Sequence, residues 1–385
     1  MTSDQLAPQT NVVVEASPAG VKPERLVSLD AFRGLTMMLM VLVNNAGSGA
    51  IYYQFKHSPW NGWTIADTIF PSFLWIVGVA ITLSLGGRIS RGVPRSKLFG
   101  QIVRRSAILY VLGLIVYLAP AFDPSTQRLL GVLQRIAICY LIVSVIYLTT
   151  SIRGQLLWIV GLLASYWMMM TLIPVPGYGA GNLTVAGNFA HFVDHLVLGR
   201  HNYVYTKTWD PEGIVSTLPS IATALFGIMA GHLLRLKRSL TERIVWLYLT
   251  GTCLIFVALV CDIWMPINKS LWTSSFSLFM AGLDFIVFAG FVWLIDGCGW
   301  KRWVRPFVIM GMNAIAVYML SELFDELISN VATTGGSSVR SWIFHTIFVP
   351  LSSAPTSAML YALAYTALMY AFAYFLYRNK WFLRV

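Results

Sequence analysis

The sequence predicts an all-α polytopic membrane protein, and three features of the chain lead to that prediction. Of its 385 residues, 57% are hydrophobic and only 11% are charged, whereas soluble proteins carry about 25% charged residues. The mean hydropathy is +0.68. The apolar residues also gather in runs of about 20, which is the length that a helix needs to cross a bilayer. We therefore predict one bundle of membrane-spanning helices.

Ten segments are apolar over the thickness of a bilayer and are predicted to be the spans. They cover about residues 28–47, 66–87, 101–119, 129–150, 155–174, 214–234, 242–263, 273–295, 305–325 and 356–377. An eleventh run, about 339–352, is shorter and is broken by Pro350 and two serines, so we expect an interfacial or re-entrant segment there. Residues 1–24 are polar and are predicted to form a disordered cytoplasmic tail, which leaves 25–385 as the membrane domain.

The distribution of basic residues predicts the orientation of these spans. With ten spans, twenty of the 27 Lys and Arg residues fall at alternate connections. The positive-inside rule places such connections in the cytoplasm, so both termini are predicted to be cytoplasmic. The net charge of +11 then reflects topology and contact with anionic membrane lipid. It does not indicate a nucleic-acid partner.

Polar side chains near the ends of the spans gather on one side of the predicted membrane. The ones on the outer half include Asn44, Asp67, Arg135, Asp210, Glu212, Asn268, Lys269 and Glu322, and Asn313 lies within the ninth span. Such groups are costly to place in a bilayer and commonly mark functional sites, so we expect a polar chamber open to the outside. Asp30 and Arg33 are three residues apart, and two interpretations of them remain open: a local ion pair and a ligand site. Arg135 at its depth calls for a carboxylate or an anionic ligand.

The connection between the first two spans is the most distinctive polar segment. It carries His57, Trp60, Asn61 and Trp63 and ends at Asp67. A carboxylate can hold an imidazole in one tautomer, which is the minimum for a general base that acts on an amine or a hydroxyl. From the residues alone, a catalytic histidine and an ordinary loop histidine both remain open. Ten residues of separation permit a contact between His57 and Asp67 without requiring it.

A second long outer connection covers 175–213 and contains three histidines, His191, His195 and His201. Loops of this length are usually functional or act as lids. Three histidines without a cysteine or paired carboxylates make a weak metal signature, so we predict no metal site.

Six ordered motifs resemble those of the transmembrane acyltransferases, in particular heparan-alpha-glucosaminide N-acetyltransferase and its bacterial relatives. They are Arg25–Gly34, Phe55–Asp67 with Phe70-Pro71 behind it, Gly131–Arg135, Asp210–Gly213, Pro266–Thr273, and Gly311–Ala314 with Tyr318 and Glu322. Together they cover the chain from about residue 25 to its end.

The resemblance implies transfer of an acetyl group from acetyl-CoA to the amine of a glucosamine on the far side of the membrane. The active-site histidine of the family matches His57, its motif asparagine matches Asn44, and the aspartate that follows matches Asp67. The imidazole would take a proton from the attacking amine, the aspartate would orient it, and Asn44, with Asn313 as a second candidate, would stabilise the oxyanion. Direct transfer and an acetyl-histidine intermediate are both open.

The remaining site predictions divide between the two substrates. Acetyl-CoA is assigned to Arg135, Lys269, Asn268, Asn313, Arg33 and Arg25. The amino sugar is assigned to Trp60, Asn61, Trp63, Asp210, Glu212 and Glu322.

The expected setting is a homodimer in a bacterial inner membrane. The lysosomal family member carries a luminal domain on an additional span, which this sequence does not show, so we expect a free amino sugar or a cell-wall fragment in the periplasm as the acceptor. Two other classes of function stay open. One is an amino-sugar transporter that uses His57 and Asp67 as a gate or proton relay, and the other is a transmembrane O-acyltransferase.

Overall fold

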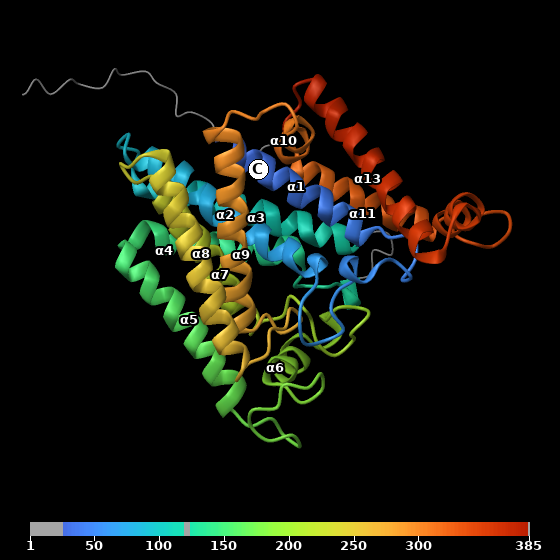
Figure 1. Ribbon diagram of the computed structural model, residues 1–385. Helices are drawn as coiled ribbons and strands as arrows, with labels where there is room; N and C mark the ends of the chain where they lie inside the picture. The colour runs from blue at the N-terminus through green and yellow to red at the C-terminus, as the bar shows by residue number, and fades with distance from the viewer. Residues whose placement is uncertain (1–25, 119–123, 384–385) are drawn as a thin grey trace, which may run out of the picture.

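The computed structural model describes residues 26–118 and 124–383, and within these ranges the chain forms helices and loops without a β-strand (Figure 1). The predicted all-α fold is confirmed. The helices are α1 (Val27–Asn44), α2 (Ile65–Ile89), α3 (Arg95–Leu118), α4 (Val132–Thr149), α5 (Ile152–Leu172), α6 (Phe189–Leu198), α7 (Thr217–Leu234), α8 (Leu240–Asp262), α9 (Ser274–Phe291), α10 (Arg305–Met312), α11 (Ala314–Asn330), α12 (Val339–Ile343) and α13 (Ala354–Arg378). A π-helical turn, Val292–Gly297, extends α9.

Nine helices in the described chain are long and apolar enough to cross a membrane, and the count reaches ten if the bent pair α10–α11 is one span. This agrees with the ten predicted spans. The short segment predicted at 339–352 is also not a span, because it consists of α12, a π-helical turn and a final 3-10 turn.

The predicted ninth span, 305–325, is bent in the structure. It consists of α10 and α11, which meet at Asn313 with a bend of 77°. Asn313 has φ −124° and ψ 31°, outside the helical range. Just before it, Gly311 packs so closely on α1 that a Cβ would lie 2.4 Å from the Asp30 carbonyl oxygen. Glycine and asparagine are weak helix formers, and the close approach to α1 fixes where the helix breaks.

Two apolar cores meet along α1. The larger core joins the first half of α1 to α2, α4, α7 and α9. The smaller core joins the second half of α1 to α10, α11 and α13. Small residues allow close crossings, because a Cβ at Gly78 of α2 would lie only 1.9 Å from the Ala224 carbonyl oxygen of α7. Such contacts hold helices together in a bilayer, where burial of apolar surface supplies little driving force.

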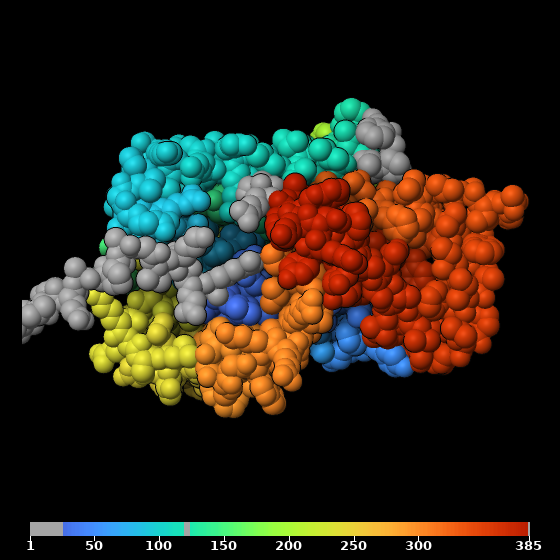
Figure 2. Space-filling model, turned by 90° about the horizontal axis from the view of Figure 1, so that it is seen from above, coloured from blue at the N-terminus to red at the C-terminus, as the bar shows by residue number. Residues whose placement is uncertain are grey.

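The connections between helices gather at two opposite ends of the bundle. One end holds residues 45–64, 124–131, 173–216, 263–273 and 331–353. Of these, 173–216 with α6 lies in the lower part of Figure 1, and 331–353 lies at its right edge. The opposite end, seen from above in Figure 2, shows the segments near residues 90, 240 and 300 and the end of α13. The basic connections therefore share one end, as the alternation of charge predicted.

Two further predictions concern segments outside the spans. The outer connection 175–213 is not a plain loop, since it contains α6 and the 3-10 turn Gly199–His201. The tail predicted at 1–24 lies outside the described residues, as does Arg25.

Candidate active site

Three loops at one end of the bundle assemble the candidate site. Gly62 in the α1–α2 loop donates its backbone N–H to the Ile267 carbonyl oxygen in the α8–α9 loop at 2.7 Å. Next to it, the Asn268 amide donates to Asn61 Oδ1 at 3.2 Å. The Trp60 indole N–H reaches the Leu183 carbonyl oxygen of the third loop at 3.0 Å. The α1–α2 loop, the polar segment identified in the sequence, is therefore held by hydrogen bonds to both of the other loops.

Asp67 serves both the start of α2 and the candidate site. Its Oδ2 accepts hydrogen bonds from the backbone N–H of Ser58 and of Thr64, both at 3.0 Å, and from the Thr64 hydroxyl at 3.1 Å. The side chain is fully buried at the N-terminal end of the helix, where the helix dipole also favours a carboxylate. These donors hold the carboxylate in one orientation, which leaves Oδ1 for another partner.

That partner is His57. Its Nδ1 lies 2.8 Å from Asp67 Oδ1, so the contact that the sequence left open is present. The pairing assigns the ring proton to Nδ1 and makes Nε2 the proton acceptor of the ring. The imidazole is 49% exposed, while the aspartate side chain is 0% exposed. A fixed, buried carboxylate behind an accessible imidazole is the arrangement that a general base or a nucleophile requires.

Lys269 is the third member of this cluster. Its Nζ lies 3.1 Å from both ring nitrogens of His57 and 3.9 Å from Asp67 Oδ1. Partial burial, followed by the charge of Lys269, lowers the pKa of His57 below its ordinary value of 6.5, against the opposing effect of Asp67. The imidazole is therefore neutral at physiological pH and able to accept a proton.

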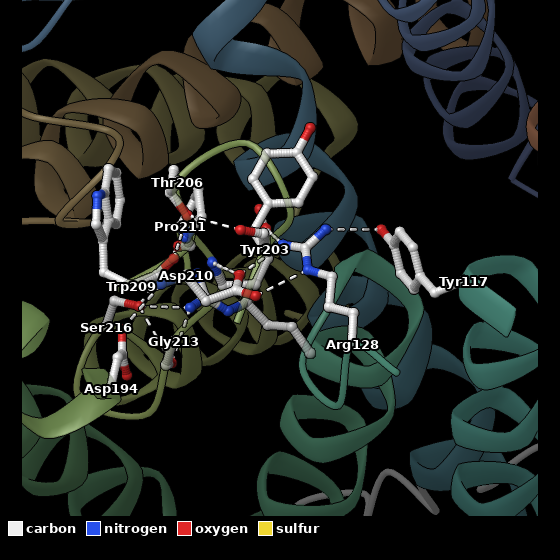
Figure 3. Close-up of polar contacts among 12 residues, drawn as sticks. Tyr117, Arg128, Asp194, Tyr203, Thr206, Trp209, Asp210, Pro211, Gly213 and Ser216 are labelled. Carbon is white, nitrogen blue, oxygen red and sulfur yellow. Dashed lines mark hydrogen bonds and ion pairs between the residues drawn. The ribbon is translucent and has the colours of Figure 1, made fainter. Parts of the chain in front are cut away.

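A second charged cluster surrounds Arg128, between α3 and α4 (Figure 3). Its guanidinium donates to both carboxylate oxygens of Asp210, at 2.8 and 2.5 Å, and to Glu212. On its other side it donates to the Tyr117 hydroxyl at 3.1 Å, and its Cζ lies 4.3 Å from the ring centre of Tyr203. Burial opposes the charge of Arg128, but Tyr117 and the two carboxylates raise its pKa well above the ordinary value.

The turn that carries Asp210 and Glu212 is held by Asp194 of α6. The two oxygens of Asp194 accept the backbone N–H of Ile214 at 2.9 Å and of Asp210 at 3.3 Å. Burial raises the pKa of Asp194 to about 6. Glu212 faces the cluster around His57 as well, because its charge acts on both His57 and Lys269. The two charged clusters are therefore neighbours that share Glu212.

Asn44 lies at the end of α1 on the same side of the bundle. Its amide donates to Glu322 Oε1 on α11 at 3.1 Å. Glu322 in turn interacts electrostatically with Tyr117 and Arg128. Asn44 and Glu322 are therefore linked through Arg128 to Asp210 and Glu212, and the polar chamber expected from the sequence stays a prediction.

The residues predicted to hold acetyl-CoA are not brought together. Lys269 lies at His57, and Asn268 is occupied by hydrogen bonds within its own loop and to Asn61. Arg135 is fully buried, donates to Gly213 and Ser216, and lies over the Trp272 ring. Only Nη2 makes these bonds, and Nε and Nη1 are buried without a hydrogen-bond partner in the described chain. The predicted carboxylate or anionic ligand of Arg135 therefore stays a prediction.

Two other predicted donors to acetyl-CoA lie away from these loops. Arg33 pairs with Asp30 at 3.5 Å, which is the local ion pair considered from the sequence. Asn313, at the bend between α10 and α11, accepts the Leu383 backbone N–H at 3.2 Å, next to the C-terminal segment. No hydrogen bond in the described ranges joins it to His57.

The aromatic residues of the site loop have different surroundings. Trp60 packs edge-on against Trp209, with ring centres 5.8 Å apart. Trp63 packs on Phe279 at 5.0 Å and is 39% exposed. Trp60 is therefore a structural support for two loops, whereas Trp63 keeps a face available.

Sequence reasoning missed Arg128, Tyr117 and Asp194 as members of the chamber. Arg128 had a signal, because it is one of only seven basic residues outside the connections assigned to the cytoplasm. Three of those seven, Arg128, Arg135 and Lys269, lie in or beside the charged clusters. A basic residue that breaks the positive-inside pattern at the mouth of a span carries a cost, so it marks a functional candidate.

Comparison with known proteins adds a family to this geometry. A family model described as heparan-alpha-glucosaminide N-acetyltransferase, catalytic, matches residues 25–261. Heparan-alpha-glucosaminide N-acetyltransferase of Homo sapiens is 32% identical, over 79% of this chain and 54% of the human protein. The protein of the same name from Mus musculus is 32% identical, over 78% of this chain and 54% of its own length. The chain thus spans about half the length of these curated relatives.

Proposed function

Because the chain belongs to the heparan-alpha-glucosaminide N-acetyltransferase catalytic family, we propose that it is a membrane acetyltransferase that moves an acetyl group from acetyl-CoA to the amine of a glucosamine-type sugar. The observation that carries this proposal is the contact between His57 and Asp67. An accessible neutral imidazole, fixed through Nδ1 by a buried carboxylate, presents Nε2 to a substrate at the mouth of the bundle.

The reaction needs one proton acceptor and one site for the developing negative charge. In direct transfer, Nε2 of His57 takes a proton from the sugar amine as its nitrogen forms a bond to the thioester carbon. The carbon–sulfur bond breaks, and the sulfur of CoA leaves with the proton returned by the imidazole. Asn44 is proposed to donate to the carbonyl oxygen as it gains charge, with Glu322 holding its amide in place.

The alternative route passes through an acetyl group on Nε2. The imidazole then attacks the thioester itself, CoA leaves, and the amine attacks the acetyl-imidazole in a second step. Rapid quenching with labelled acetyl-CoA in the absence of acceptor separates the two routes. Label on the peptide that contains His57 supports the intermediate, and unlabelled protein supports direct transfer.

Glu212 is proposed to attract the ammonium form of the amino sugar, which releases one proton to solvent before its nitrogen attacks the thioester. Its Oε2 binds Arg128, while its Oε1 makes no hydrogen bond within the described residues and is not sealed from solvent. Arg128, followed by Arg135 and Lys269, outweighs the effect of burial and lowers the pKa of Glu212. An ionised carboxylate next to His57 attracts a cationic substrate to the reacting atoms. Asp210 is proposed to support it, since both of its oxygens are occupied by Arg128.

The side of the reaction follows from the ends of the bundle. The candidate site lies opposite the end that collects the basic connections, which the positive-inside rule places in the cytoplasm. We therefore propose that the acceptor binds on the periplasmic side of a bacterial inner membrane. A homodimer is part of the same proposal, and native mass spectrometry of the detergent-solubilised protein would test it by the mass of the complex.

Purified protein with labelled acetyl-CoA and glucosamine tests the proposed activity. The expected product is labelled N-acetylglucosamine. The matched control is N-acetylglucosamine as acceptor, whose blocked amine should receive no label. Absence of transfer to every amine tested would refute the N-acetyltransferase. Label on a hydroxyl oxygen in the control would favour an O-acyltransferase. Exchange of labelled sugar across liposomes without acetyl-CoA would favour a transporter.

A further inference from the structure

We propose that Lys269 is a positioning residue that acts through His57 by keeping the imidazole neutral, rather than a ligand for the phosphates of acetyl-CoA. The proposal rests on the acetyltransfer function proposed above. The sequence analysis assigned Lys269 to acetyl-CoA, and the proposal gives this residue a role at His57 instead.

The first support is the geometry of the three groups. The ammonium of Lys269 lies 3.1 Å from Nδ1 and 3.1 Å from Nε2 of His57. The ammonium is therefore within hydrogen-bond distance of both ring nitrogens. Because Asp67 already takes the Nδ1 proton at 2.8 Å, the lone pair that the ammonium meets is that of Nε2, and a proton on Nε2 would bring two positive charges together. The 3.9 Å distance from the ammonium to Asp67 Oδ1 completes a three-membered cluster.

The second support is the construction of the loop that carries Lys269. Asn268 Oδ1 accepts the Leu271 backbone N–H at 2.9 Å, and the Lys269 carbonyl accepts that of Trp272 at 2.9 Å. Trp272 has a φ of 52°, a left-handed conformation that is unusual for a tryptophan. It is fully buried below the Arg135 guanidinium. The loop is therefore held tightly enough to fix where Lys269 emerges.

The third support is the balance of charge around His57. Three elements face the imidazole with charged groups: Asp67 of α2, Lys269 of the α8–α9 loop, and Glu212 of the loop before α7. The two carboxylates stabilise the imidazolium, and with them alone His57 would hold its proton. A protonated imidazole can neither accept a proton from an amine nor attack a thioester. Burial lowers the pKa of His57 most, and Lys269 supplies the charge that adds to this effect against the two carboxylates.

The test measures the protonation of His57 without requiring catalysis. Diethyl pyrocarbonate reacts only with neutral imidazole, so the rate at which the His57 peptide is modified, followed by mass spectrometry across pH, gives the titration midpoint in the whole protein. Lys269→Met should move that midpoint upward by about one pH unit. Lys269→Arg keeps the charge and should leave it near the wild-type value. Lys56→Met, an exposed neighbour of His57 in sequence, is the matched control and should change nothing.

The kinetic arm separates this role from binding of phosphate. For Lys269→Met, kcat should fall about tenfold at pH 6 and recover at pH 8, where the imidazole is neutral without help. The KM for acetyl-CoA should stay within about twofold of wild type. An unchanged midpoint, or a KM for acetyl-CoA that rises at every pH, would overturn the proposal. If the wild type acetylates no amine, the proposed function fails. The modification midpoints then still show whether Lys269 controls the protonation of His57.

Size-exclusion profiles identify a variant that has lost its fold. If Lys269→Met is misfolded, Lys269→Gln replaces it as the neutral variant, with the same upward shift expected. A midpoint for Lys269→Gln equal to that of wild type would overturn the proposal.

Discussion

Two charged clusters lie side by side at one end of the bundle, and they are built in opposite ways. Around His57, the imidazole is half exposed and its carboxylate partner takes only Nδ1. Around Arg128, the three charged side chains are at most 9% exposed, and the guanidinium has partners on both faces. The difference shows that charge in a membrane bundle serves two purposes. An open cluster is available for chemistry, whereas a closed one fixes the loops that shape the site.

Glu212 belongs to both clusters. Its contact with Arg128 ties it to the closed cluster, and its charge acts on His57 and Lys269 in the open one. Changes in the open cluster should therefore alter turnover with little effect on stability, and changes in the closed cluster should do the reverse. Substitution of Glu212 should have a smaller effect on turnover and should change the KM for the amino sugar.

Asp67→Asn should have the largest effect on turnover among the variants in the open cluster. An asparagine cannot stabilise the imidazolium, so we expect kcat to fall by about 10²–10⁴. The charge of Asp67 raises the pKa of His57, so its loss should move the acid limb of the rate profile to lower pH, opposite in direction to Lys269→Met. An Asp67→Asn enzyme with wild-type kcat, or with an acid limb moved upward, would contradict the orienting role.

Arg128→Met should have the largest effect on stability. It leaves two buried carboxylates without their cation, which costs about 3–5 kcal/mol and should appear as a lower unfolding temperature in detergent. Because Asp210 and Glu212 can take up protons once the cation is gone, the loss should be smaller at pH 5 than at pH 8. Arg200→Met, an exposed arginine in the adjacent loop, is the control. Equal stability of the two variants would show that the Arg128 cluster is not structural.

The fold was predictable from the sequence because a bilayer requires long apolar helices. Composition and charge alternation were enough to predict ten spans and a polar end of the bundle. The break at Asn313 was not predictable, since it depends on the close contact of Gly311 with α1, some 280 residues earlier. Local sequence shows a weak helix former there but not the neighbour that turns it into a bend.

The candidate site was predictable in its members more than in their roles. His57, Asp67 and Lys269 were all identified, but Lys269 was assigned to the cofactor because the sequence shows the type of a residue and not the partner it faces. Arg135 and Arg128 illustrate the same limit. The arginine at greater depth uses one guanidinium nitrogen to bind a carbonyl and a hydroxyl, while its other two nitrogens are buried without a hydrogen-bond partner in the described chain. The one at the mouth of the span binds the carboxylates.

Glu212→Gln should have the smallest effect of these variants and one of a different kind. The amide keeps the shape of the side chain but loses the charge proposed to attract the ammonium, so we expect the KM for glucosamine to rise about tenfold with a modest change in kcat. The effect should weaken as salt increases, because screening reduces the attraction in the wild type. Steady-state rates at low and high ionic strength check both points. A KM that is unchanged at low salt would rule out this role for Glu212.

The most direct test of the central claim compares acetyl transfer to glucosamine by His57→Ala and His345→Ala proteins. Both positions are exposed histidines at the same end of the bundle, so the pair controls for loss of an imidazole as such. With labelled acetyl-CoA, the His345→Ala protein should transfer at the wild-type rate, and the His57→Ala protein should fall by at least about 10² while keeping its unfolding temperature. Full activity of the His57→Ala protein would contradict the claim that this imidazole, held by Asp67, carries the reaction.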